Sequence, residues 1–145
     1  MANYLTRSSA VLLLLCAQTG ISAEYPNMEG QWVGHIRVVT SGTSETGQVS
    51  SGGAIISESE LVFTVDYQDG ATFIGRSRSS NASGSTAGVS VYGSIRSNGK
   101  EAMFVTSTGG NGLIWFENPT AFEYCFTNLS ENTATAYCAK LSKKE

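Results

Sequence analysis

Residues 89–107, VSVYGSIRSNGKEAMFVTS, carry the clearest signal for the fold of this chain. Asn98-Gly99 at its centre is the strongest two-residue hairpin signal, because both turn positions need a positive φ. The turn sets three pairs across the two strands: Ile95 with Ala102, Gly93 with Phe104, and Arg96 with Glu101. The last is an opposite-charge pair, which marks the outer face of the sheet. The stretch therefore predicts an antiparallel hairpin with one apolar face.

The rest of the chain after residue 23 carries the same kind of pattern. Short segments rich in Val, Ile, Thr and aromatic residues are separated by Gly, Asn, Asp and Ser, and we find no helical run. The predicted strands are Gln31–Thr40, Gly53–Ser57, Leu61–Tyr67, Thr72–Ser77, Val89–Arg96, Glu101–Ser107, Leu113–Phe116, Phe122–Thr127 and Thr135–Leu141. Segments Ser41–Ser51 and Ser79–Gly88 are predicted loops. We expect one domain at residues 24–145, with eight or nine strands.

Residues 1–23 have the features of a secretory signal peptide. Arg7 precedes a short apolar core at residues 10–17, and Ile21-Ser22-Ala23 offers a small-residue cleavage site. The apolar core is far shorter than the ~18–20 residues of a membrane-spanning helix, so we expect no membrane span. The segment predicts a secreted or periplasmic protein. The alternative is a lipoprotein anchored through Cys16, although such signals carry a small residue before the cysteine and this one has Leu15.

Cleavage would leave two cysteines, Cys125 and Cys138. An even number of cysteines in an exported chain predicts a disulfide. Pairing them across a hairpin sets the neighbouring register: Glu123 opposite Lys140, Phe122 opposite Leu141, Tyr124 opposite Ala139, and Phe126 opposite Tyr137. One face of this hairpin is then polar and the other is entirely aromatic and aliphatic, which supports the register.

A third hairpin turns at Gln68-Asp69-Gly70. We expect a three-residue turn with Gly70 left-handed, because a two-residue turn at Asp69-Gly70 would put Asp66 on the aromatic face. This turn places Thr64 opposite Ile74. It also brings four residues onto one face: Phe63, Val65, Phe73 and Gly75.

Consecutive antiparallel hairpins with one apolar face must close or stack to bury that face. The sequence therefore predicts an all-β fold, an up-and-down antiparallel barrel of about eight strands, with a β-sandwich as the alternative. Gly34, Gly75 and Gly93 lie inside strands, as glycines do where a sheet bends or another backbone comes close. An outer-membrane barrel is disfavoured, because its strands run ~9–11 residues and these segments are shorter.

Composition excludes several classes of function. The 145 residues carry 9 Lys and Arg against 12 Asp and Glu, so we expect no nucleic-acid partner. The one histidine, His35, lies on the predicted outer face, where it cannot build a catalytic triad or a metal site alone. The acidic pairs Glu58/Glu60 and Asp66/Asp69 lie at expected strand ends or turns, where solvation explains them. We expect no enzyme activity, no catalytic residue, no metal and no cofactor.

Aromatic residues gather on the predicted inner face. The candidate ligand-binding residues are Trp32, Phe63, Phe73, Phe104 and Tyr124, and the same face holds Phe122, Phe126 and, as a further candidate, Trp115. In a small barrel such residues either fill the interior or line a cup for one small ligand. Ser77 and Thr106 are the inward polar residues that could orient a ligand. Asn81-Ala82-Ser83 and Asn128-Leu129-Ser130 are glycosylation sequons, which matter only in a eukaryotic source.

Short motifs carry two resemblances. Gly30-Gln31-Trp32 resembles the start of lipocalins and avidin-like proteins, in which the tryptophan closes the barrel base; no biotin-binding residue is carried over. The chain is also similar to a group of small exported bacterial proteins of uncharacterised function. Three motifs support this: Gly30-x-Trp32-x-Gly34, Gln68-Asp69-Gly70-x-x-Phe73-x-Gly75, and Tyr124-Cys125 with Ala136-x-Cys138. This second resemblance implies export and a barrel, and it implies no activity.

The favoured function is an exported lipocalin- or avidin-like barrel that binds a small, mostly apolar molecule in its open end. The alternative is a non-enzymatic interaction module, such as an inhibitor of an extracellular enzyme or an envelope scaffold. Its extracellular protein partner would meet the two predicted loops. Those loops lack the Tyr, Trp and Phe anchors of tight interfaces.

Overall fold

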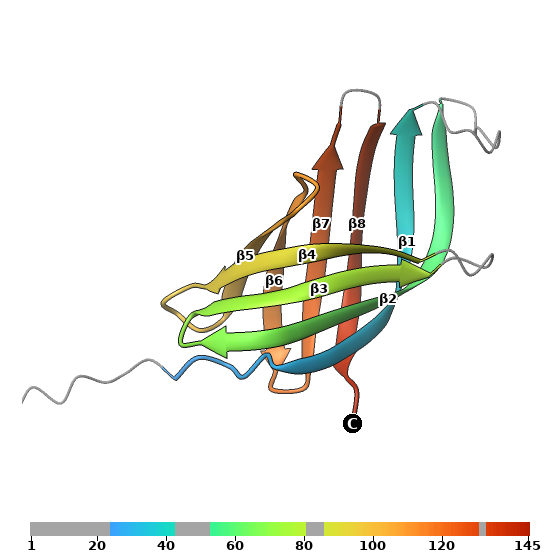
Figure 1. Cartoon of the computed structure of the whole chain (residues 1–145). Helices are drawn as coiled ribbons and strands as arrows, with labels where there is room; N and C mark the ends of the chain where they lie inside the picture. The colour runs from blue at the N-terminus through green and yellow to red at the C-terminus, as the bar shows by residue number, and fades with distance from the viewer. Residues whose placement is uncertain (1–23, 43–52, 81–85, 131–132) are drawn as a thin grey trace, which may run out of the picture.

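Eight antiparallel strands form one closed barrel in the computed structural model, which describes residues 24–42, 53–80, 86–130 and 133–145 (Figure 1). Each strand pairs with the next along the chain, and β8 pairs with β1 to close the sheet. The strands are β1 (Gly30–Gly42), β2 (Ala54–Asp69), β3 (Thr72–Ser80), β4 (Thr86–Ile95), β5 (Glu101–Thr106), β6 (Asn111–Asn118), β7 (Ala121–Leu129) and β8 (Thr133–Lys143). The predicted up-and-down barrel is confirmed, and the β-sandwich is excluded.

Two of the nine predicted strands are one strand. Gly53–Ser57 and Leu61–Tyr67 both belong to β2, which continues through the polar residues between them. Those residues stay paired with β1, where Glu58 lies opposite Arg37 and Glu60 opposite His35. Both glutamates are exposed on the outer face, so their polarity marks the side that faces solvent rather than the end of a strand.

The observed strand lengths correct one argument made from the sequence. Six strands reach 9 to 16 residues, so short strands do not distinguish this barrel from an outer-membrane barrel. Outer-membrane barrels have a polar interior, whereas the inward side chains here form an apolar core. The described residues contain no helix that could span a membrane.

Two of the three predicted hairpin registers are confirmed. In β4–β5, Ile95 pairs with Ala102 and Gly93 with Phe104, and the Arg96 guanidinium lies 2.5 Å from a Glu101 carboxylate oxygen. In β7–β8 every predicted pair is present. The Cys125–Cys138 disulfide joins these two strands.

The register of β2–β3 differs from the prediction. Asp69 pairs with Thr72, so the turn itself holds two residues, and Thr64 lies opposite Arg76 rather than Ile74. A β-bulge between Val65 and Tyr67 shifts the register. The bulge lets Asp66 point outward. Asp66 therefore stays off the aromatic face, as predicted, but through a bulge and not through a three-residue turn.

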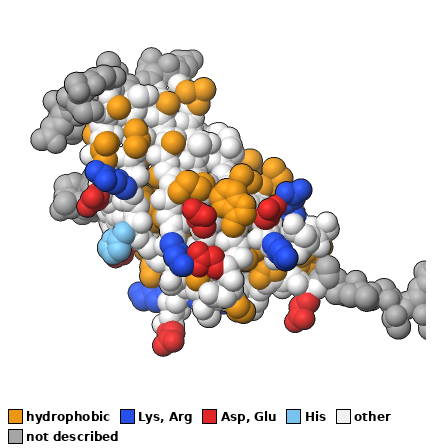
Figure 2. Space-filling model, turned by 180° about the vertical axis from the view of Figure 1, so that it is seen from behind, with side chains coloured by type: hydrophobic (Ala, Val, Ile, Leu, Met, Phe, Trp, Pro, Cys, Tyr) orange, Lys and Arg blue, Asp and Glu red, His pale blue; other side chains and the backbone are white. Residues whose placement is uncertain are grey.

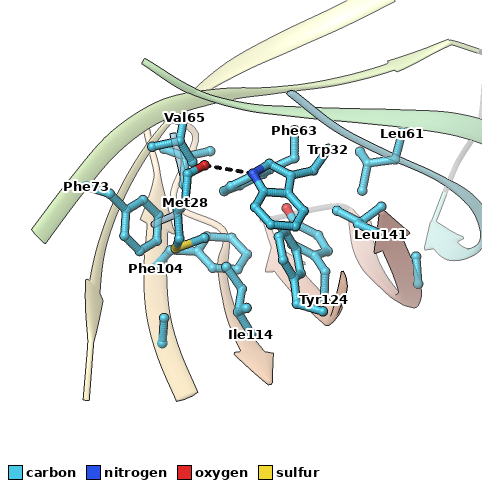
Figure 3. Close-up of a cluster of buried hydrophobic side chains, with 14 of the residues drawn as sticks. Met28, Trp32, Leu61, Phe63, Val65, Phe73, Phe104, Ile114, Tyr124 and Leu141 are labelled. Atoms are coloured by element: carbon cyan, nitrogen blue, oxygen red, sulfur yellow. Dashed lines mark hydrogen bonds between the residues drawn. The ribbon is translucent and has the colours of Figure 1, made fainter. Parts of the chain in front are cut away.

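The barrel has two unlike ends, which we call the base and the mouth. The base is the end at which β1 begins and β8 ends, and residues 24–29 lie against it. The Trp32 indole N–H donates a hydrogen bond to the Met28 carbonyl at 2.7 Å (Figure 3). The Gln68 side chain accepts from the Met28 amide and donates to the Pro26 and Gly70 carbonyls. The base is therefore closed by its own chain.

The mouth is the end at which β1 ends and β8 begins. The residues that connect β1 to β2, β3 to β4 and β7 to β8 there include 43–52, 81–85 and 131–132, which lie outside the described residues. Most of the two predicted loops and the Asn81 sequon fall in these segments. The predicted signal peptide and Cys16, at residues 1–23, also fall outside the described part.

Candidate functional site

The lower half of the barrel, next to the base, is a solid core. Trp32, Phe63, Phe73 and Phe104, four of the five predicted ligand-binding residues, have 2% or less of their surface exposed. Their rings pack on one another, with centroids 6.4 Å apart for Phe63–Phe73 and 6.2 Å for Phe63–Phe104 (Figure 3). Spacings of this size are typical of aromatic pairs in protein cores. The structure brings these four residues together as mutual packing partners.

Glycines inside the strands make room for these rings. A Cβ built on Gly93 would lie 2.0 Å from the Phe73 ring, and one built on Gly112 would lie 2.2 Å from the Phe104 ring. Gly75 lies against backbone instead, since its Cβ would meet the Thr64 carbonyl oxygen at 2.1 Å. The motifs that carried the resemblance to exported bacterial proteins therefore include positions with clear packing roles.

The upper half of the barrel, toward the mouth, contains a cavity of about 200 Å³. Tyr124 lies at the boundary between this cavity and the core, because its ring stacks on Phe104 at 4.9 Å while it also lines the cavity. Phe126 and Tyr137 form aromatic walls, with their centroids 5.3 Å apart. The other lining residues are Ile36, Val38, Leu61, Ser77, Ser79, Val89, Thr108, Asn128 and Thr135.

Two residues that line this cavity each carry a buried polar atom with no hydrogen-bond partner among the described residues. These atoms are the Tyr124 hydroxyl and the Asn128 side-chain oxygen. Burial raises the pKa of the Tyr124 phenol well above its usual value; nearby Tyr137 acts in the same direction, and the Ser77 hydroxyl opposes the shift more weakly. Burial also raises the pKa of the Tyr137 phenol. Both phenols are therefore uncharged at neutral pH.

The two predicted polar residues have different surroundings. Ser77 is buried and lines the cavity, as a ligand-orienting residue would. The Thr106 hydroxyl instead accepts from the Gly110 amide at 3.0 Å and contacts the Gly110 carbonyl at 3.2 Å. Thr106 thus holds the β5–β6 turn together. The predicted inward position of Trp115 is wrong. Ile114 and Phe116 on either side of it contact the core, so alternation puts Trp115 on the outer face, where it is half-buried.

Sequence reasoning missed Asn128. The sequence pattern predicts a strand that ends at Thr127, and it gives Asn128 only the role of a glycosylation sequon. β7 in fact continues to Leu129, so the alternation that puts Tyr124 and Phe126 inside also puts Asn128 inside. Its amide oxygen is buried within the barrel. Extending the period-2 pattern by one more step would have found this residue.

The outer face carries the groups considered for catalysis. His35 is exposed on β1, opposite Glu60, and Asp66 forms an ion pair with Arg76 at 2.8 Å. Within the described residues, the one gathering of metal-ligand side chains is Glu123 with Cys125 and Cys138. The sulfur atoms of those two cysteines are bonded to each other, so they are not available as thiolate ligands.

The outer face also carries an apolar band. Neighbouring strands contribute exposed residues that follow one another across the sheet: Tyr67, Ile74, Tyr92, Val105, Met103 and Leu113. A groove of about 430 Å³ runs along the band between β2 and β5. Figure 2, which shows the molecule from behind, also has hydrophobic side chains lying between charged ones on the outer surface.

No protein-family model matches this chain, and no curated protein matches it. Among solved structures, the chain is similar to EF1p2_mFAP2b, solved bound to DFHBI, with 14% identity, TM-score 0.50, and coverage of 81% of this chain and 94% of that one. A de novo designed fluorescence-activating β-barrel has 16% identity, TM-score 0.48 and coverage of 85% and 97%. The S-type phycobiliprotein lyase CPES from Guillardia theta has 10% identity, TM-score 0.37 and coverage of 81% and 88%. The first of these comparisons shows a shared barrel fold and nothing finer.

Proposed function

We propose that this protein binds one small, mostly apolar molecule inside the mouth of the barrel. The observation that carries the proposal is the 200 Å³ cavity lined by Tyr124 and Asn128, whose hydroxyl and amide oxygen are buried without partners. A buried polar atom without a hydrogen bond costs about 1–3 kcal/mol. A cavity that keeps two such atoms is therefore better explained as a site that a ligand completes than as a packing defect.

The size and lining of the cavity limit the ligand. An apolar cavity of about 150 Å³ is large enough to hold benzene, so 200 Å³ suits a molecule of roughly one ring with small substituents. The described lining contains no His, Cys, Asp, Glu, Lys or Arg. We therefore propose binding without catalysis. The eight-stranded barrel solved with DFHBI supports the proposal only by showing a similar fold holding a small molecule.

The first test is native mass spectrometry of the protein purified gently from its own source. We expect an additional bound mass of one small molecule that disappears on denaturation and is recovered by solvent extraction. A cavity-filled variant, Ser77→Leu, prepared in the same way provides the matched control and should carry no such mass. Protein that is always free of ligand, and that also binds no compound from a library of small ring compounds, would overturn the proposal.

Export is part of the same proposal. The predicted signal peptide would carry the protein to a secreted or periplasmic location, and the Cys125–Cys138 disulfide is compatible with such an oxidising compartment. Mass spectrometry of the mature protein should find Glu24 as its first residue. A lipid on Cys16 would instead support the anchored alternative.

A second candidate function is that of an interaction module, and the outer apolar band favours it. Monomeric proteins rarely expose large contiguous apolar surface without a use for it, and here Tyr92 and Met103 are 49% and 60% exposed in the band. The partner would meet the sheet rather than the predicted loops. Sedimentation of the wild type and of Met103→Lys tests the simplest case, association with a second copy. A wild type that stays monomeric at all concentrations would contradict that case.

A further inference from the structure

We infer that the ligand is an uncharged molecule with a single planar ring and an O–H or N–H group that donates a hydrogen bond to Asn128. This inference rests on the proposed function, since it names the chemistry of the ligand in that cavity. It follows from three independent features of the lining: its charge, its aromatic walls and its unpartnered atoms.

The lining excludes charged ligands. Every polar group that the described residues contribute to the cavity is a neutral hydroxyl or amide, from Ser, Thr, Tyr or Asn. Moving an ion into such a site without an opposite charge is costly. The phenols cannot supply that charge, because burial raises the pKa of both Tyr124 and Tyr137. A carboxylate or an ammonium group on the ligand would therefore find no counter-charge among the described residues of the lining.

The walls favour a flat ring. Phe104 and Phe126 lie nearly parallel, with an interplanar angle of 7°, and Tyr124 and Tyr137 are stacked at 22°. These four rings form a continuous aromatic surface that rises from the core into the cavity. A planar ring in the cavity extends this surface by stacking or edge contacts, each of which is worth about 0.5–1.5 kcal/mol beyond the burial of area.

The unpartnered atoms require a donor. The Asn128 side-chain oxygen can only accept a hydrogen bond, whereas the Tyr124 hydroxyl can accept or donate. Both residues line the cavity, and both atoms are buried without a hydrogen-bond partner. A ligand O–H or N–H directed at Asn128 would satisfy the first atom, and the ligand heteroatom could accept from Tyr124. An apolar ring of the same size would leave both atoms unsatisfied.

The experiment compares four fluorinated rings by fluorine NMR titration at pH 7. 4-Fluorophenol has the donor, 4-fluoroanisole lacks it, fluorobenzene lacks the oxygen, and 4-fluorobenzoate is charged. We expect 4-fluorophenol to bind at least 10-fold more tightly than 4-fluoroanisole or fluorobenzene, and 4-fluorobenzoate not to bind. The preference for 4-fluorophenol should be lost in Asn128→Ala and reduced in Tyr124→Phe. It should persist in Tyr92→Phe, which removes an exposed hydroxyl on the outer face.

The possible outcomes separate the two proposals. Equal binding of the three neutral rings would overturn the donor requirement and leave the small-ligand function standing. Tighter binding of 4-fluorobenzoate than of 4-fluorophenol would overturn the exclusion of charge. Failure of all three neutral rings to bind the folded wild type would overturn the inferred ligand class, and together with a protein that is always free of ligand it would overturn the proposed function itself.

Discussion

At the scale of single residues, the barrel interior depends on glycines that face aromatic rings. Gly93 illustrates this, because the Phe73 ring occupies the space that a side chain on Gly93 would need. The sequence predicted a close approach at this glycine. It could not predict that the neighbour is Phe73, because the two residues lie on different strands and meet only once the register of β3 and β4 is fixed.

Gly93→Ala should therefore destabilise the barrel by about 1–3 kcal/mol, the usual cost of overpacking a core. Urea unfolding at equilibrium measures the change. Gly88→Ala in the same strand is the matched control, since its Cβ would meet nothing nearer than the Ser77 carbonyl oxygen at 3.9 Å, and we expect it to be neutral or slightly stabilising. A second change, Phe73→Leu, should recover part of the loss in Gly93→Ala. Equal effects of the two alanine substitutions would contradict the packing role of Gly93.

The buried tyrosines predict a loss of stability at alkaline pH. Burial raises the pKa of Tyr124 and Tyr137 above the unfolded value of 10.0, so above pH 10 the folded state holds protons that the unfolded state has released. The free energy of unfolding then falls as the pH rises, by up to about 1.4 kcal/mol per pH unit for each tyrosine. Tyr124→Phe should make this fall less steep between pH 10 and 11.5. Tyr92→Phe, which changes an exposed tyrosine, should not; identical slopes in all three proteins would contradict the prediction.

At the scale of elements, the hairpins show what local sequence does and does not determine. Asn98-Gly99 fixes one residue pair between β4 and β5, and the two cysteines fix one pair between β7 and β8. The other pairs of each hairpin follow from the strict alternation of the strands. β2–β3 contains a bulge at Asp66, which adds a residue to one strand only. No local signal announces that bulge, so counting outward from Gly70 gave the correct face for Phe73 and the wrong partner for Thr64.

The closure of the base is a second feature at this scale, and it gives the Gln68 motif a structural role. The Gln68 side chain accepts one hydrogen bond and donates two, and these three bonds hold residues 26–28 and the β2–β3 turn together. Gln68→Ala should cost about 1–3 kcal/mol and loosen this segment, because it leaves the part-buried Met28 amide without its partner. Hydrogen exchange of the Met28 amide should become faster. Gln31→Ala, at an exposed position on β1, should leave that rate unchanged, and an unchanged rate in Gln68→Ala would refute the clamp.

At the scale of the whole molecule, one apolar interior serves two purposes. The aromatic residues on the inner face were predictable from alternation alone. Whether they fill the barrel or line a cup depends on how far each ring lies from the base, which a period-2 pattern does not record. The structure divides them into two groups. The rings of Trp32, Phe63, Phe73 and Phe104 are packed in the solid core, whereas the rings of Phe126 and Tyr137 border the cavity.

This division predicts a trade between stability and binding at Ser77. Ser77 is 5% exposed and lines the cavity, so Ser77→Val places two methyl groups into empty space without disturbing the solid core below. Filling a cavity commonly stabilises a protein by about 0.5–2 kcal/mol. The same methyl groups occupy the volume of the ligand, so the affinity for 4-fluorophenol should fall at least 10-fold. Thermal unfolding and fluorine NMR on one sample measure both quantities.

Thr64→Val provides the control, since Thr64 lies on the outer face of β2. This substitution does not fill the cavity, so it should produce neither the gain in stability nor the loss of binding. A Ser77→Val protein that is more stable and binds 4-fluorophenol as well as the wild type would place the ligand elsewhere, and the apolar groove between β2 and β5 would be the next site to test.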